Sequence, residues 1–89
     1  MAMAVPALPI LTLYSRGYCH LCDDMRAALE LLRGEFGFEL KVLDVDADPV
    51  LLARYDERVP VLTAGEQELC HYYLDSAAVR AYLAATTLS

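Results

Sequence analysis

The chain has 89 residues, of which 57% are hydrophobic, and a formal net charge of −6 from 13 acidic and 7 basic side chains. This length predicts a single domain over residues 1–89, with enough apolar side chains to fill its core. The acidic balance argues against a protein that binds nucleic-acid phosphates. The sequence also lacks an uninterrupted apolar run of the roughly 20 residues that cross a bilayer.

The N-terminal segment MAMAVPALPI has no basic residue and is interrupted by Pro6 and Pro9, which argues against a secretory signal. Three cysteines are too few for a disulfide framework in a secreted domain. We therefore expect a cytoplasmic monomer that binds neither nucleic acid nor membrane.

The first half of the chain predicts a strand, a helix and a second strand. Residues 10–14 form an apolar run typical of a buried strand. From Leu21 to Leu32 the apolar residues recur at spacings of three and four, which predicts an amphipathic helix. Gly34 and Gly37 are expected to end this helix, and residues 39–45 alternate as a strand does.

The second half predicts a short helix, a β-hairpin and a last helix. Asp48 is a candidate N-cap with Pro49 in the first helical position. Residues 58–64 read as a third strand and 67–73 as the returning strand of a hairpin. Asp75 or Ser76 then caps the final helix. The expected order is β-α-β-α-β-β-α.

Two cysteines, Cys19 and Cys22, stand where the first strand gives way to the first helix, in the sequence YSRGYCHLC. At a helix N-terminus the free N–H groups and the helix dipole stabilise a thiolate, which lowers the pKa of a cysteine there. Cys22, one turn further on, is placed to attack a mixed disulfide on Cys19. The spacing therefore favours a redox-active dithiol, with Cys19 as the nucleophile and Cys22 as the resolving thiol.

Acidic and basic neighbours act on this pair in opposite directions. Asp23 and Asp24 raise the cost of a thiolate on Cys19, whereas Arg16, three residues earlier, is expected to offset them.

The strand, the CxxC at the helix start and the later RVPVL resemble the thioredoxin fold in its short glutaredoxin form. YSRxxCHLC with RVPVL is more narrowly similar to small bacterial glutaredoxin-like proteins. The resemblance implies an α/β fold with a four-stranded mixed sheet and helices on both faces. It also implies a cis bond between Val59 and Pro60, beside the cysteine pair. Arg16, Tyr18 and Val59 fall where glutaredoxins contact glutathione.

The chain departs from the glutaredoxin pattern after its last strand. Glutaredoxins carry a Gly-Gly pair there, whereas this sequence has Tyr72 and Tyr73. We therefore expect disulfide chemistry on a disulfide-containing protein or small thiol, no resident cofactor, and glutathione as a weakly bound co-substrate.

Two further interpretations are consistent with the sequence. One is a non-catalytic thioredoxin-fold module that binds a peptide at the Pro60 edge. The other is a metal or iron–sulfur carrier, since Cys70 and His71 add ligand types to the cysteine pair. Adjacent strand residues point to opposite faces, so only one of these two could join a metal site. We accordingly predict no metal site and interpret Cys70 as a small buried residue.

Overall fold

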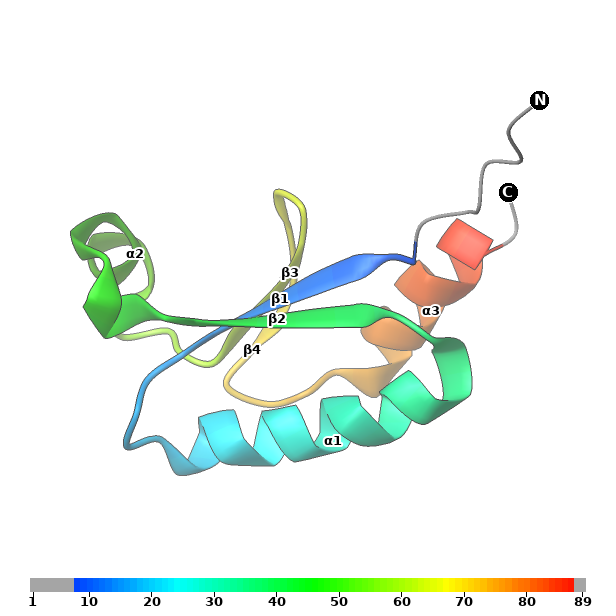
Figure 1. Ribbon diagram of the computed structural model, residues 1–89, viewed down its shortest axis with the longest axis horizontal. Coiled ribbons are helices and arrows are strands. Elements are labelled where there is room, and N and C mark those ends of the chain that lie inside the picture. Colours follow the sequence, from blue (N-terminus) through cyan, green and yellow to red (C-terminus); the bar gives the residue numbers. More distant parts are fainter. Residues whose placement is uncertain (1–7, 88–89) are drawn as a thin grey trace.

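The computed structural model describes residues 8–87, which form one mixed β-sheet and three α-helices (Figure 1). The strands are β1 (Ile10–Ser15), β2 (Glu39–Asp44), β3 (Val61–Ala64) and β4 (Gln67–His71). The helices are α1 (His20–Phe36), α2 (Pro49–Tyr55) and α3 (Ser76–Thr87), with a short 3-10 helix η1 (Val45–Ala47) before α2. The observed order is the predicted β-α-β-α-β-β-α. The expectation about a secretory signal falls mainly on residues 1–7, outside the described residues.

The four strands lie in the order β2-β1-β3-β4. β1 runs parallel to β2 and antiparallel to β3, and β3 pairs antiparallel with β4. The parallel pair requires a crossover, which α1 supplies. Among residues 8–87, no helix has both the length and the apolar character needed to cross a bilayer.

Alternate residues of the central strands serve two separate cores. Leu11 and Leu13 of β1 face α1 and α3, which cover one side of the sheet (Figure 1). Tyr14, the next residue, packs on the opposite side against the cluster made by η1, α2 and β3. This alternation follows from the two-residue period of a strand. The larger core consists of Leu11, Leu13, Met25, Leu29, Leu32, Phe38, Leu62, Ala64, Val79 and Leu83, and the smaller of Val45, Tyr55 and Val61.

The first helix ends at the second of its two predicted stop residues. Gly34 was expected to stop it, but α1 continues through Gly34 to Phe36. The residue that ends the helix is Gly37, whose φ of 68° lies in the left-handed region and whose N–H donates to the Arg33 carbonyl. A left-handed residue after the last turn satisfies a free carbonyl, and glycine adopts that conformation at little cost.

Four strand boundaries also differ from prediction. β1 continues to Ser15, one residue past its predicted end at residue 14. β2 ends at Asp44, not at residue 45, because the Asp44 carboxylate accepts the Asp46 N–H and starts η1. β3 begins at Val61, not at residue 58, since the Arg58 N–H donates to the Tyr55 carbonyl in the turn after α2. β4 ends at His71, not at residue 73.

The predicted helix caps are present. The Asp48 carboxylate accepts the Val50 N–H at 2.9 Å, with Pro49 in the first turn of α2. The Asp75 carboxylate accepts the Ala78 N–H at 3.0 Å just before α3, so Asp75 is the cap of the two candidates. Each cap satisfies a helix N–H that would otherwise lack a partner.

Candidate redox site

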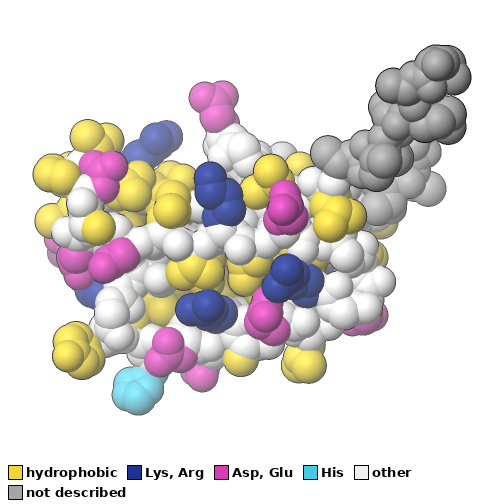
Figure 2. Space-filling model, in the orientation of Figure 1, with side chains coloured by type: hydrophobic (Ala, Val, Ile, Leu, Met, Phe, Trp, Pro, Cys, Tyr) yellow, Lys and Arg dark blue, Asp and Glu magenta, His cyan; other side chains and the backbone are white. Residues whose placement is uncertain are grey.

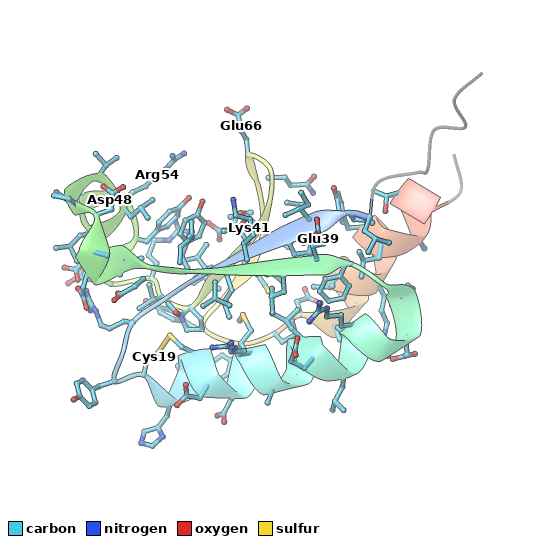
Figure 3. All side chains as sticks on the ribbon, in the orientation of Figure 1. Cys19, Glu39, Lys41, Asp48, Arg54 and Glu66 are labelled. Atoms are coloured by element: carbon cyan, nitrogen blue, oxygen red, sulfur yellow. A yellow bond between two sulfur atoms is a disulfide. The ribbon has the colours of Figure 1, made fainter. Side chains whose placement is uncertain are left out.

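Cys19 and Cys22 form a disulfide at the start of α1, with their Cα atoms 5.2 Å apart (Figure 3). Cys19 is the N-cap of the helix, with extended backbone at φ −143° and ψ 104°. Its Sγ accepts the Cys22 N–H at 3.1 Å. A sulfur in this position lies where the first-turn N–H groups and the helix dipole stabilise negative charge.

The two cysteines differ in their access to solvent. Cys22 is only 3% exposed, whereas Cys19 is partly exposed at the surface. An incoming disulfide therefore reaches Cys19 first, and Cys22 can reach only a partner already bonded to Cys19. This is the division of roles that exchange through a mixed disulfide requires.

Arg16 is held by carboxylates from two other parts of the chain. Its guanidinium lies 3.1 Å from the Asp46 carboxylate of η1 and 2.6 Å from that of Asp56, which follows α2. The hydrogen bonds to Asp56 and Asp46 raise the pKa of Arg16 above its ordinary value. The sequence predicted that Arg16 offsets the charge of Asp23 and Asp24 near Cys19, but its contacts are to these two other aspartates.

The Val59–Pro60 peptide bond is cis, as expected. Pro60 is buried and immediately precedes β3, whose Val61 pairs with Tyr14 near the end of β1. The Pro60 carbonyl accepts the Tyr72 N–H at 2.8 Å. Val59 packs against the smaller core. Pro60 thus lies next to the strand end from which the chain continues to Cys19.

Two hollows flank the first turn of α1. One, of about 200 Å³, is lined by Gly17, Tyr18, Cys19, His20 and Asp23. The other, of about 270 Å³, is lined by Leu21, Asp24, Met25, Tyr72, Tyr73 and Leu74. Leu21 lies between the two cysteines in the chain, but neither cysteine lines the second hollow. We call these the Tyr18 hollow and the Tyr73 hollow.

The segment after β4 is shaped by Tyr72. Its φ of 64° is left-handed, and it is the one described non-glycine residue with a positive φ. Its hydroxyl donates to the Glu57 carbonyl at 2.6 Å, which ties the segment to the turn after α2. Tyr73 is 71% exposed. Both tyrosines line the Tyr73 hollow, at the place where glutaredoxins carry glycines.

Cys70 and His71 lie on opposite faces of β4. Cys70 packs against the larger core, and burial raises the pKa of its thiol. His71 is exposed and contacts the Glu68 carboxylate at 3.0 Å. Within residues 8–87, no group of three or more His, Cys, Asp or Glu side chains is arranged to hold a metal ion.

The sequence identified the cysteine pair and the residues around it, but it missed two features of the site. It did not identify Asp46 and Asp56 as partners of Arg16, which lie 30 and 40 residues away in the chain. It also did not find the apolar lining from Leu21, Met25 and Leu74. The run of aspartates before α2 includes Asp46, but Asp56 follows that helix and is not part of the run.

Comparisons with known proteins relate the chain to one family and one fold. A family model described as a glutaredoxin-like domain (DUF836) matches residues 10–84. A protein of Nitrosomonas europaea, solved by NMR, is 43% identical with a TM-score of 0.78 over 92% of this chain and 98% of that one. An uncharacterized protein of Mycobacterium tuberculosis is 30% identical over 89% of this chain and 87% of its own length.

The wider likeness is to thioredoxins. Thioredoxin 1 of Thermosipho africanus superposes with a TM-score of 0.61 over 88% of this chain and 98% of its own, at 17% identity, which shows a shared fold. With this fold, the Cys19–Cys22 disulfide at the start of α1 supports a redox type of function. The chain belongs to the glutaredoxin-like domain family (DUF836) and has the thioredoxin fold.

Proposed function

We propose that this protein is a thiol–disulfide oxidoreductase in which Cys19 is the nucleophile and Cys22 the resolving thiol. The observation that carries the proposal is the asymmetry of the pair. The Cys19 sulfur is partly exposed and accepts a first-turn N–H, whereas Cys22 is buried. A pair of inert structural cysteines would not need one member at the surface and in the thiolate-stabilising position.

The reaction starts from the dithiol form. The Cys19 thiolate attacks one sulfur of a substrate disulfide, which breaks the substrate S–S bond and forms a mixed disulfide on Cys19. The released substrate thiolate takes up a proton. Cys22 then loses its proton and attacks the Cys19 sulfur, which forms the Cys19–Cys22 disulfide and releases the second substrate thiol. Two electrons pass to the substrate, and an external thiol reductant returns the protein to its dithiol form.

The proposal assigns glutathione the role of a weakly bound co-substrate. Two observations support this. Arg16, which would meet a glutathione carboxylate by analogy with glutaredoxins, is already paired with Asp46 and Asp56. Tyr72 and Tyr73 occupy the segment where smaller residues would let the tripeptide backbone approach.

Turnover of hydroxyethyl disulfide, with a coupled thiol reductant, tests the proposed function. Cys19→Ser is expected to abolish turnover, because it removes the attacking sulfur. Pre-reduced Cys22→Ser, mixed with hydroxyethyl disulfide in the absence of the reductant, is expected to stop after the first step and to accumulate a mixed disulfide on Cys19, visible as a mass increase of the intact protein.

Cys70→Ser is the matched control, since it removes a thiol that packs against the core away from the disulfide. It is expected to retain wild-type turnover. Absence of turnover in the wild-type protein, at any thiol reductant concentration, would contradict the proposal and would favour a non-catalytic binding module.

A further inference from the structure

Residues of the first turn of α1 line both hollows, and each hollow presents an exposed tyrosine. Tyr18 is 103% exposed in the first, and Tyr73 is 71% exposed in the second. Tyrosine gives a large contact area at low entropic cost and is enriched at the centres of binding sites. A molecule that contacts both tyrosines must extend from the Tyr18 hollow, which Cys19 lines, into the Tyr73 hollow.

The Tyr73 hollow is largely apolar. Leu21, Met25 and Leu74 form its floor and walls together with the two tyrosines. Its volume of about 270 Å³ accommodates one side chain of the size of leucine or phenylalanine. An apolar group placed there is withdrawn from water on several sides, which is the main favourable term in such contacts.

The same surface is acidic. Asp24 lines the Tyr73 hollow and Asp23 lines the Tyr18 hollow, and neither lining includes a lysine or arginine among the described residues. Arg16, three residues before Cys19, is paired with two carboxylates. Figure 2 shows acidic side chains gathered over the beginning of α1, at the lower left. The net charge of −6 adds a long-range field of the same sign.

We infer that the substrate of this site is a polypeptide disulfide whose reactive cysteine is flanked by an apolar residue and by basic residues. The inference rests on the proposed function and names its substrate class. The apolar neighbour enters the Tyr73 hollow, the chain crosses Cys19 and contacts Tyr18, and the basic side chains meet Asp23 and Asp24. Glutathione, which is short and carries two carboxylates, matches neither the length nor the charge of this surface.

The chemical step is the exchange already described, with the polypeptide as the oxidised partner. The Cys19 thiolate attacks the substrate cysteine nearer the Tyr73 hollow, and the other substrate sulfur leaves and is protonated. Attack by Cys22 then releases the first sulfur as a thiol. The protein dithiol is oxidised by two electrons and the substrate disulfide is reduced by two.

Pre-reduced protein mixed with synthetic peptide disulfides tests the inference. One probe is a disulfide-linked dimer of a peptide with leucine and lysine beside its cysteine; the second has glutamate in place of lysine, and the third has glycine in place of leucine. The second-order rate of Cys19–Cys22 oxidation is followed for each probe. Each rate is divided by the rate of the same peptide with dithiothreitol, which removes differences in the intrinsic reactivity of the probes.

At low ionic strength the lysine peptide is expected to react about tenfold faster than the glutamate peptide, within the range of electrostatic steering. The ratio is expected to fall towards one at about 1 M salt, where charges more than roughly 3 Å apart are screened. Asp23→Asn with Asp24→Asn is expected to lower the ratio at low salt. Tyr73→Ala is expected to reduce the advantage of the leucine peptide over the glycine peptide.

Glu66→Gln is the charge-matched control. Glu66 lies in the β3–β4 turn, on the other side of the sheet from α1 (Figure 3), and its substitution is expected to leave all rates and ratios unchanged. Equal normalised rates for the lysine and glutamate peptides, or a faster glutamate peptide, would overturn the inference while hydroxyethyl disulfide is still reduced. If hydroxyethyl disulfide is not reduced either, the proposed function itself is wrong.

Discussion

The three cysteine thiols are expected to differ in their reactivity towards an alkylating reagent. Limiting iodoacetamide added to the fully reduced protein near neutral pH is expected to label Cys19 first. Cys22 is buried, so the reagent reaches it less readily, and burial raises the pKa of the half-buried Cys70 thiol, so Cys70 presents less thiolate. Peptide mapping by mass spectrometry after partial labelling measures the order. Preferential labelling of Cys22 or Cys70 would contradict the proposed role of Cys19 as the nucleophile.

Arg16 is a positioning residue, because its guanidinium connects the segment before Cys19 to Asp46 and to Asp56. Arg16→Gln is expected to lower disulfide turnover by about fivefold, well below the roughly 100-fold that ~1 Å of misplacement can cost. It is also expected to speed amide hydrogen exchange in residues 16–19, which a loss of charge alone would not do.

Arg80→Gln provides the comparison for this variant, since Arg80 makes a similar two-bond contact with Glu35 at the far end of α1. It should leave both turnover and exchange near the site unchanged. A specific increase in the KM for glutathione in Arg16→Gln, with hydroxyethyl disulfide turnover intact, would instead show that Arg16 binds the tripeptide.

At the level of elements, the segment between β4 and α3 controls how much space lies beside the cysteine pair. Replacing both Tyr72 and Tyr73 with glycine is expected to increase turnover of a glutathionylated peptide. Stability should change little, because relief of a left-handed tyrosine by about 1 kcal/mol offsets loss of the Tyr72 hydrogen bond, also worth about 1 kcal/mol. Steady-state kinetics and urea unfolding measure the two effects. An unchanged rate would show that these tyrosines do not limit access of glutathione.

The order of elements could be predicted from the sequence, because each depends on nearby residues. The Asp48 cap, Pro49 after it and the apolar spacing from Leu21 to Leu32 are all local signals. The strand ends were less predictable. β4 stops where Tyr72 adopts a left-handed conformation, and nothing about a tyrosine in the sequence indicates that.

The features of the candidate site also fall into two groups, those that local sequence signals predict and those that depend on the packing of distant segments. Cys19 and Cys22 could be proposed as site residues from their spacing, and Pro60 from the resemblance to glutaredoxins. The Tyr73 hollow is lined by residues from 21–25 and from 72–74. Arg16 contacts Asp46 and Asp56, which lie 30 and 40 positions further along the chain. Such contacts depend on how α1, the β4–α3 segment and α2 pack around the sheet, which no local period specifies.

At the scale of the whole molecule, one half-buried thiol and one buried tyrosine make the free energy of unfolding depend on pH in the alkaline range. Burial raises the pKa of Cys70 above its ordinary 9.0 and that of Tyr55 above 10.0. Above these ordinary values the unfolded chain releases protons that the folded chain retains, so the free energy of unfolding falls as pH rises. In the disulfide form, we therefore expect the unfolding midpoint to decrease from about pH 9 upward.

Cys70→Val tests the first part of this decrease. The variant keeps an apolar side chain against the core and removes the ionisable thiol. Its unfolding midpoint is therefore expected to begin to decrease about one pH unit higher, where ionisation of Tyr55 in the unfolded chain becomes the main contribution. Urea unfolding of the oxidised protein and of the variant between pH 7 and about 10.5 measures the difference. Identical profiles for the two proteins would show that Cys70 does not contribute.

The exposed ring of Tyr18 also bears on how the protein is observed. The chain contains six tyrosines and no tryptophan, so its ultraviolet emission comes from phenol rings alone. A disulfide quenches the excited state of aromatic rings near it, and Tyr18 lines the same hollow as Cys19. Reduction of the cysteine pair is therefore expected to brighten the emission of the unlabelled protein, and Tyr18→Leu to remove most of that change. The molecule then reports its own oxidation state in real time, without an attached dye.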